Sequence, residues 1–472
     1  MTFYFFDVET SGFSGRDDRI MQFAGQRTDM DLKPIGEPDN ILVKVTPDVL
    51  PQPDAVLVHG ITPQKTLMEG ITEGEFAKYL TAQVFKTDTI MVGFNNIRFD
   101  NEFIRFTLWR NFYDAYEWSW KDGSSTWDLL DVVRMTRALR PEGIEWPFAP
   151  DGKPSNRLEY LSAVNKLDHA DAHDALSDVK ASIALAQLVK SKQPKLFDYL
   201  LQHRNKNKVA PLINSGQPVV YTSGRYPSEF NKTTLAVMVA QKSDKSGALM
   251  YDLRIDPDEF KDLSAAELAK RWAARGPDAP YFPVKTLGYN KCPAVAPAEV
   301  LEAGDGYKKL QLHKEIVSNH LKKLQTATGF GNKLLEALEI MWPKRQPELV
   351  TDPLKVDGQL YDRFVPDTDK TKLSVIRAAK AEELGNLNLN FKDERLKLLL
   401  PLYKARNYPK NLTETEQMEW EAFRQRKLIQ SGRAQDFFGR LEELAKTPGL
   451  DGEKKYLLEE LNLYAQSIML EG

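Results

Sequence analysis

Carboxylates near the start of the chain have a spacing that suits binding of divalent cations. Asp7 and Glu9 close the apolar run FYFFDVE. Residues i and i+2 of a strand point to the same face, so the two side chains stand together at the strand's end. Hard divalent cations prefer such paired oxygen ligands. A solvated strand end is the alternative, and we assign no function to a second D-x-E pair, Asp451 and Glu453, which lies in a polar turn.

A third carboxylate follows an apolar strand and a polar turn. Asp100 ends the sequence GFNNIRFD, in which the turn is followed by the start of a helical pattern. A negative charge is favoured at a helix N-terminus, so we expect Asp100 there. For this residue alone, a simple capping role remains the alternative to metal binding.

The sequence HDALSD supplies a histidine and a fourth carboxylate. We expect Asp174 to be the N-cap of a helix, His173 to precede it and Asp178 to lie on the first turn. His169 and Asp174 have the same spacing as His173 and Asp178. We prefer the second pair because small neighbours of Asp178 leave room for a metal, whereas Asp174 is the better cap.

Together these groups predict hydrolysis of phosphodiester bonds. Four carboxylates at a strand end and two helix starts can hold two Mg²⁺ ions about 3.5–4 Å apart. In that arrangement one ion activates water and the other stabilises the leaving 3′ oxygen. A histidine whose pKa is near neutrality can take the proton of the water.

The three motifs resemble those of the DEDD exonuclease superfamily, which are D-x-E, N-x-x-x-D and H-x-x-x-x-D. Position 174 is Asp rather than the Tyr of the alternative subgroup, so the chain resembles the histidine branch, DEDDh. The resemblance implies a ribonuclease-H-like fold, with a mixed five-stranded sheet flanked by helices. It implies His173 as general base and, as metal ligands, Asp7, Glu9, Asp100 and Asp178.

The hydrophobic pattern divides the chain into three regions. The first ~190 residues are α/β in character. We expect strands at 3–9, 20–28, 41–45 and 89–94, and helices at 73–85, 100–110, 127–138, 157–165 and 174–190. A β-rich module spans about 216–290, helices return at 307–342, and the chain is helical from about 352.

Several further stretches resemble the bacterial exodeoxyribonuclease I family. They include LPQPDAVLVHGITPQ (51–65), SSTWDLLDVVR (124–134) and LLLPLYKARNYP (398–409). The resemblance implies a DEDDh exonuclease domain at 1–193, an SH3-like domain with flanking helices at 194–346 and a helical domain at 350–472. It implies processive 3′→5′ release of 5′-mononucleotides from single-stranded DNA, in repair and recombination, with two Mg²⁺ ions that Mn²⁺ can replace. Region 210–290 matches less well.

Composition sets limits on the compartment and the partners. The 472 residues include 64 Lys+Arg and 67 Asp+Glu, for a formal charge of −3, which lacks the basic excess typical of nucleic-acid-binding proteins. A single cysteine, Cys292, excludes an internal disulfide and fits the cytoplasm. The N-terminus lacks signal-peptide features, and no apolar stretch is long enough to span a membrane. We expect a monomer without membrane contact.

Contacts with a single strand require cations and aromatic rings. Four aromatic residues occur between positions 113 and 120, although core packing is the commoner role for a tryptophan. Phe13 follows the ETSG turn and is expected to wedge against the terminal base. The expected nucleic-acid contacts are Thr10, Phe13, Asn96, Arg105, Tyr116, Trp120, Arg134 and Arg157. For Arg157 a structural ion pair is an equal alternative.

Local charge differs from the average. Residues 308–346 contain eight Lys or Arg and three Glu, and HRNKNK adds basic residues at 204, 206 and 208. This density predicts a phosphate track or a docking surface for an acidic peptide, against the alternative of a solvated helix face. The family resemblance suggests the acidic C-terminal tail of single-stranded DNA-binding protein as such a peptide.

Two other functions remain open at this point. The same motifs occur in RNA exonucleases and proofreading modules, and selection against RNA would require a group that crowds the 2′-hydroxyl. A catalytically inactive DNA-binding scaffold is the alternative from another class of protein. The presence of all five motif residues disfavours it.

Overall fold

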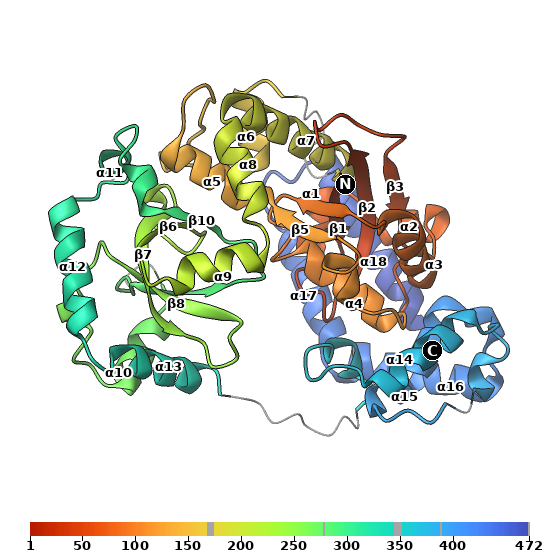
Figure 1. Cartoon of the computed structure of the whole chain (residues 1–472). Helices are drawn as coiled ribbons and strands as arrows, with labels where there is room; N and C mark the ends of the chain where they lie inside the picture. Colours follow the sequence, from red (N-terminus) through yellow and green to blue (C-terminus); the bar gives the residue numbers. More distant parts are fainter. Residues whose placement is uncertain (168–173, 277–278, 344–351, 388, 471–472) are drawn as a thin grey trace. The chain divides into compact units, whose positions relative to one another are not determined.

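The computed structural model describes residues 1–167, 174–276, 279–343, 352–387 and 389–470 (Figure 1). These residues form two compact units. The first contains the described residues of 1–125, 170–180 and 347–472, and the second those of 126–169 and 181–346. Both units therefore combine segments that are distant in sequence. The domain boundaries expected near 193 and 346 stay a prediction.

Strand β1 (Thr2–Thr10) is the apolar strand that carries the first carboxylates. Its even-numbered side chains, such as Tyr4 and Phe6, pack into a core with helix residues including Phe76 and Phe103. The odd-numbered side chains face the other side, where Phe3 is fully buried. Asp7 and Glu9 continue this second face, as the period of two predicts.

The sheet around β1 is mixed and has five strands in the order β3-β2-β1-β4-β5. β1 pairs antiparallel with β2 and parallel with β4, and β2 pairs antiparallel with β3. The other strands are β2 (Ile20–Thr28), β3 (Asp39–Leu42), β4 (Thr89–Gly93) and β5 (Ser125–Asp128). The strand expected at 41–45 ends early, because Val43 forms an isolated bridge with Ile71 instead.

Helices cover this sheet in the first unit. The expected helix at 73–85 consists of an α-helix with a capping box formed by Thr72 and Glu75, followed by a π-helical turn. The elements are α1 (Pro53–His59), α2 (Pro63–Glu69), α3 (Glu73–Tyr79), η1 (Leu80–Val84), α4 (Asp100–Arg110), η2 (Glu117–Ser119) and the first turns of α7 (Ala175–Lys192).

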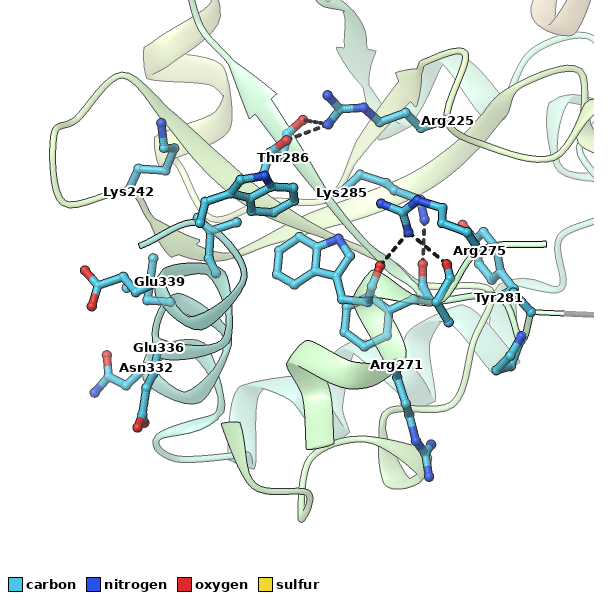
Figure 2. A pocket seen from close by; sticks show the side chains of 18 of the residues that line it. Arg225, Lys242, Arg271, Arg275, Tyr281, Lys285, Thr286, Asn332, Glu336 and Glu339 are labelled. Carbon is cyan, nitrogen blue, oxygen red and sulfur yellow. Dashed lines mark hydrogen bonds between the residues drawn. The ribbon is translucent and has the colours of Figure 1, made fainter. Parts of the chain in front are cut away.

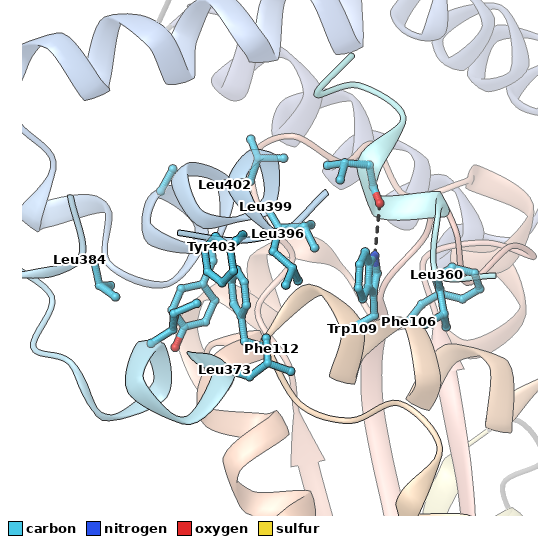
Figure 3. Close-up of a cluster of buried hydrophobic side chains, with 14 of the residues drawn as sticks. Phe106, Trp109, Phe112, Leu360, Leu373, Leu384, Leu396, Leu399, Leu402 and Tyr403 are labelled. Carbon is cyan, nitrogen blue, oxygen red and sulfur yellow. Dashed lines mark hydrogen bonds between the residues drawn. The ribbon is translucent and has the colours of Figure 1, made fainter. Parts of the chain in front are cut away.

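The described residues of the C-terminal part of the first unit form helices joined by loops, with no strand among them, as expected. Its elements are η6 (Val356–Gly358), α14 (Asp367–Ala378), η7 (Leu384–Asn386), α15 (Glu394–Asn407), η8 (Pro409–Asn411), α16 (Glu414–Gln425), η9 (Arg426–Gln430), α17 (Arg433–Ala445) and α18 (Gly452–Leu470). Trp109 and Phe112 pack with Leu399 and Tyr403 of α15 in one core (Figure 3). The Trp109 indole N–H donates to the Val356 carbonyl at 3.2 Å.

The second unit is built on an antiparallel sheet in the order β10-β6-β7-β8-β9. Its strands are β6 (Val219–Thr222), β7 (Thr233–Gln241), β8 (Gly247–Asp252), β9 (Val284–Gly288) and β10 (Ala294–Pro297). Its helices are α5 (Leu129–Leu139), α6 (Leu158–Val164), the remainder of α7, α8 (Pro194–Gln202), α9 (Lys206–Asn214), α10 (Ala265–Ala273), α11 (Gly306–Lys309), α12 (Lys314–Thr326) and α13 (Phe330–Met341). Three 3₁₀ turns complete it: η3 (Ser228–Phe230), η4 (Pro257–Glu259) and η5 (Ala298–Leu301).

Among the described residues, none of the helices combines the length and the apolar character that crossing a lipid bilayer requires.

Buried ion pairs join the β1–β2 region to the C-terminal helices within the first unit. Arg406 bridges Asp357 at 2.7 Å and Asp48 at 2.8 Å. Arg19 also binds Asp357, at 2.9 Å, and Lys427 binds Asp48 at 2.6 Å. The exposed fractions of these side chains are all below a tenth. We call these five residues the buried ion network.

The network is favourable only while its members are paired. Burial alone would raise the pKa of Asp48 and Asp357, yet the surrounding cations hold both well below the ordinary value. Burial lowers the pKa of Lys427 to about 8, and this effect outweighs its attraction to Asp48. An unpaired charge in this site would be strongly destabilising, because water cannot replace the lost partner.

Replacing Asp357 by Asn should therefore lower the free energy of unfolding by about 3–5 kcal/mol. The exposed pair of Lys446 and Glu442 provides the control, because exposed pairs contribute about 0–1 kcal/mol. Chemical denaturation of Asp357→Asn and Lys446→Met measures both values. Equal, small effects would show that the buried ion network does not stabilise the fold.

Candidate active site

Asp7, Glu9 and Asp178 form a compact group of half-buried carboxylates. One oxygen from each lies within 4.8 Å of those of the other two. Asp7 and Glu9 come from the end of β1, and Asp178 comes from the first turns of α7. The alternation of strand side chains and the helix start thus bring together three of the four predicted metal ligands.

Asp100 joins this group through the backbone of β1. It is the first residue of α4 and only 4 % exposed, and its Oδ1 accepts a hydrogen bond from the Val8 N–H at 3.1 Å. The pairing of β1 with β4 covers only Thr2 to Phe5. The Asp100 carboxylate therefore binds β1 beyond the end of the parallel ladder, between the positions of Asp7 and Glu9.

The N-terminus of α7 is held by β2. The predicted cap is confirmed, because the Ser177 N–H donates to Asp174 Oδ2 at 3.1 Å. Gln22 of β2 donates from Nε2 to Asp174 Oδ1 at 3.0 Å, and Gln22 lies opposite Glu9 in the sheet. This contact fixes the helix that carries Asp178. His173 and its alternative His169 lie outside the described residues.

The carboxylates raise one another's affinity for protons. Burial raises the pKa of Asp7 well above its ordinary value, and the charges of Asp100 and Glu9 add to this effect. Burial, followed by the charges of Asp178 and Asp100, raises the pKa of Glu9 to about 9. Four acids this close are not all ionised near neutral pH unless positive charge is brought to them.

This donor set fits hard divalent cations. Carboxylate oxygens that converge on one point are what Mg²⁺ and Mn²⁺ prefer, and a cation would relieve the repulsion that raises the pKa values. By contrast, the second D-x-E pair begins α18, where Asp451 Oδ1 accepts from the Lys454 N–H at 2.8 Å. It is a helix cap, as its lack of a preceding strand suggested.

The turn after Glu9 is held tightly by the protein. The Thr10 hydroxyl donates to the Gly12 carbonyl at 2.6 Å. A Cβ added at Gly12 would lie 2.4 Å from Gln52 Nε2 and 2.5 Å from Asp18. The close approach of these two side chains explains why position 12 is glycine. Phe13 is 68 % exposed, as a side chain that meets substrate must be.

Three further expected nucleic-acid contacts, Trp120, Arg105 and Tyr116, also lie in the first unit. Trp120 is 63 % exposed, whereas Trp118 is buried and belongs to the core. Arg105 is largely buried and binds Glu102 at 2.8 Å. The Tyr116 ring lies 5.8 Å from the Arg105 guanidinium.

The sequence reasoning missed two aromatic residues of the C-terminal helical region. Tyr361 and Phe364 have ring centroids 6.3 and 5.8 Å from that of Tyr116, and Phe364 is 81 % exposed. The feature of the sequence that could have indicated them is the presence of two aromatic residues in the polar stretch QLYDRFVPD. We call Tyr116, Tyr361 and Phe364 the aromatic patch.

The remaining expected contacts differ in exposure. Thr10 and Asn96 are buried, and the Asn96 amide donates to Asn101 Oδ1 at 3.4 Å. Arg134 and Arg157 belong to the second unit. Arg134 pairs with Asp131 at 2.7 Å. Arg157 pairs with Glu159 at 3.5 Å, which is the alternative ion pair, although its side chain remains 71 % exposed. All these contacts stay predictions.

Three family models match successive parts of the chain. They describe an exonuclease at residues 4–186, the exonuclease I SH3-like domain at 204–339 and the exonuclease I C-terminal domain at 354–468. Exodeoxyribonuclease I of Haemophilus influenzae is 38 % identical over 99 % of both chains. The Escherichia coli enzyme is 38 % identical over 99 % of this chain and 98 % of its own.

This chain belongs to the exodeoxyribonuclease I family. The expected fold class of ribonuclease-H-like, SH3-like and helical parts is therefore confirmed, as is the enzyme class. The chain is a 3′→5′ exonuclease acting on single-stranded DNA, which is the activity that the family resemblance implied.

Solved structures of the family agree with this fold over its whole length. E. coli exonuclease I in complex with a dA16 oligonucleotide is 37 % identical and superposes with a TM-score of 0.93, covering 99 % of each chain. The exonuclease I of Methylocaldum szegediense is 39 % identical, with a TM-score of 0.91 and the same coverage.

The metal-free protein should become less stable as the pH rises from about 5 to about 9. Glu9 titrates near 4.5 when unfolded and at about 9 when folded, so the folded state binds more protons across this range. Melting temperatures in EDTA should fall with pH by several degrees, and Mg²⁺ should reduce the fall. Glu9→Gln should flatten the EDTA curve. A wild-type curve in EDTA that is flat or rises would contradict the repulsion among the carboxylates.

Proposed function

We propose that Asp7, Glu9, Asp100 and Asp178 bind two Mg²⁺ ions and that this centre carries the exonuclease activity. The observation that supports it most is the convergence of carboxylates whose pKa values are raised by burial and by one another. Bound ions would lower the pKa of the attacking water and stabilise charge on the leaving 3′ oxygen. Mn²⁺ accepts the same oxygen ligands and is expected to substitute. A relative has been crystallised with zinc and single-stranded DNA.

His173 is proposed as the general base that accepts the proton of the attacking water. An imidazole titrates near neutral pH and suits this task. The anchored Asp174 cap, bound by Gln22 and by the Ser177 N–H, supports the proposal because His173 directly precedes it in the chain. The fixed helix start would limit how far the base can move from Asp178.

For the substrate, we propose that Phe13, Trp120 and the aromatic patch contact bases. Aromatic faces stack on bases of any sequence, which suits an enzyme that degrades a strand residue by residue. Phe13 and Phe364 are more than two-thirds exposed, so stacking would remove apolar surface from water. Arg105 and Arg157 are proposed to contact phosphates.

We also propose that the chain binds the acidic tail of single-stranded DNA-binding protein. A structure of SSB with exonuclease I is known in the family. The basic stretch 308–345 supports the proposal through some of its lysines and not through others. Lys309 and Lys323 are already neutralised, because Lys309 pairs with Glu142 and Lys323 with Asp256, each at 2.7 Å. Lys308 and Lys322 are exposed and form no ion pair among the described residues. A monomer in the cytoplasm, where a bacterial chromosome lies, completes the proposal.

A digest of end-labelled substrates tests the proposed centre directly. With Mg²⁺, 5′-labelled single-stranded DNA should be shortened from its 3′ end, while duplex DNA and RNA of the same sequence remain. EDTA should stop the reaction. Loss of one ligand removes several kcal/mol of transition-state stabilisation, so Asp7→Asn should lower kcat by about a thousandfold or more.

Asp451→Asn is the matched control for that variant. It removes the same carboxyl group from the D-x-E sequence at 451–453, which only caps α18. Its activity should equal that of the wild type. Full activity of Asp7→Asn, or activity in EDTA, would contradict the metal centre, and equal cleavage of RNA would favour the RNA exonuclease.

The two histidines of the third motif region can be distinguished by substitution. His173→Ala should lower kcat by about 10²–10⁴-fold, the usual contribution of a general base, and should remove the acidic limb of the pH–rate profile. His169→Ala makes the same change in chemistry and should keep both the wild-type kcat and the acidic limb of the profile. The opposite result would assign the base to His169.

A further inference from the structure

Gln22 of β2 lies beside Glu9 in the sheet but is not one of the predicted metal ligands. In the pairing of β1 with β2 it stands directly opposite Glu9, so the two side chains share one face. Gln22 is only 6 % exposed. A buried side-chain amide must find partners for its N–H groups and its oxygen within the protein. The partners of Gln22 therefore show what this residue does.

Both N–H groups and the oxygen of the Gln22 amide are hydrogen-bonded. Nε2 donates to Asp174 Oδ1 at 3.0 Å and to Asn40 Oδ1 at 2.9 Å. Oε1 accepts from the Ala175 N–H at 3.4 Å. An ionised carboxylate can only accept and a backbone N–H can only donate, so these partners determine the orientation of the amide. Gln22 thus binds the cap residue of α7 and the first residue of that helix at once.

The start of α7 depends on such contacts from outside the helix. The first N–H groups of any helix have no partner within it. Asp174 supplies an acceptor for the Ser177 N–H, and Gln22 supplies one for the Ala175 N–H. Ala175 is fully buried, so water is a poor substitute for the Gln22 oxygen. The Asp178 N–H then donates to the Asp174 carbonyl at 3.0 Å, which links Asp178 to the same anchored turn.

Asp174 is a fifth acid near the clustered carboxylates, and Gln22 engages it. The charge of Asp174 is among the causes that raise the pKa values of Asp7 and Glu9. Its Oδ1 is bound by Gln22 and its Oδ2 by a helix N–H, so both oxygens serve the cap. Asp178 instead has an oxygen within 4.8 Å of those of Asp7 and Glu9. The contacts of Gln22 therefore separate a capping acid from a predicted ligand on one helix turn.

We propose that Gln22 is a positioning residue of the exonuclease centre. By binding Asp174 and the Ala175 N–H, it sets the start of α7 and so the place of Asp178 relative to Glu9 on the neighbouring strand. Replacing a residue that orients metal ligands typically costs about 10–100-fold in metal affinity or activity. The inference rests on the proposed function, because it requires Asp178 to be a metal ligand.

Gln26→Leu is the matched control for Gln22→Leu. Gln26 lies four residues further along β2, on the same face, and is 7 % exposed. Its Nε2 donates to the carbonyls of residues 27, 35 and 36, which belong to β2 and the segment before β3. Both substitutions remove a buried amide from one strand, and only Gln22→Leu removes the link to α7.

Thr286→Val is a second control, placed in the other unit. Thr286 of β9 accepts a hydrogen bond from Arg225 through Oγ1 at 2.5 Å, and both residues line a pocket formed with α10 and α13 (Figure 2). Valine has a similar shape without the hydroxyl, so this change also removes a side-chain hydrogen bond. The described residues that line this pocket include none of the predicted metal ligands.

Binding of Mn²⁺ to the full chain without DNA is measured by the electron paramagnetic resonance signal of the free ion. Gln22→Leu should raise the Kd for Mn²⁺ by about 10–100-fold. It should lower kcat on a single-stranded oligonucleotide by a similar factor and leave the KM for DNA unchanged. Gln26→Leu and Thr286→Val should bind Mn²⁺ as the wild type does. Melting curves in EDTA verify that each variant is folded.

Asp174→Ser tests the same contact from the other side and does not require Gln22→Leu to fold. Serine at an N-cap still accepts from the N–H groups of the first turn, but it is too short to keep the bond with Gln22. This variant should also weaken Mn²⁺ binding by about tenfold or more. Adding Gln22→Leu to Asp174→Ser should have a much smaller effect than adding it to the wild type, because both changes remove one contact.

Wild-type Mn²⁺ affinity in Gln22→Leu, or in Asp174→Ser, would overturn the inference. An equal loss in Gln26→Leu or Thr286→Val would do so too, because it would show a general effect of lost hydrogen bonds. Asp7→Asn distinguishes this failure from that of the proposed centre. If Asp7→Asn binds Mn²⁺ like the wild type, the metal centre is contradicted and the inference with it. If Asp7→Asn loses the ion and Gln22→Leu does not, only the inference fails.

Discussion

The repulsion among the clustered carboxylates is the constraint on which the structure of the first unit depends. Oxygens of Asp7, Glu9 and Asp178 lie within 4.8 Å of one another, and Asp100 binds the intervening backbone of β1. Burial makes this repulsion stronger, since water screens it poorly there. Backbone elements must therefore hold the side chains together against it. A central strand, a helix start and a capped helix do so.

The C-terminal helices contribute to this support. Asp357 binds both Arg406 and Arg19. The Arg19 backbone N–H donates to Ser11 Oγ at 2.9 Å, and the Arg19 carbonyl accepts from the Ser11 N–H at 2.8 Å. Ser11 is two residues beyond Glu9. The buried ion network thus anchors the turn that follows β1, and the helical region is structurally part of the first unit rather than an accessory to it.

Local periodicity made most of the first unit predictable. The alternation along β1 predicts the shared face of Asp7 and Glu9, and the cap signal at Asp174 predicts the start of α7. β5 was missed because it has four residues and Asp128 immediately caps α5. Helix α10 was missed inside a region of short strands.

Long-range contacts leave no local pattern in one sequence. The contact between Gln22 and Asp174 and the contacts of the buried ion network join residues that are distant along the chain. The net charge of −3 over the whole chain also argues, wrongly, against a nucleic-acid partner, because an average hides how the charges are distributed. Acids concentrate in the group around Asp7, whereas basic residues concentrate in stretches such as 204–208 and 308–345.

The most direct test of the metal centre is anomalous scattering from crystals grown with Mn²⁺ and a single-stranded oligonucleotide that resists cleavage. Two anomalous peaks within coordination distance of Asp7, Glu9, Asp100 and Asp178 are expected, with Asp7 contacting both. Asp7→Asn crystals should lose at least one peak. Absence of any peak among these carboxylates, with the oligonucleotide bound and its 3′ end in place, would contradict the account.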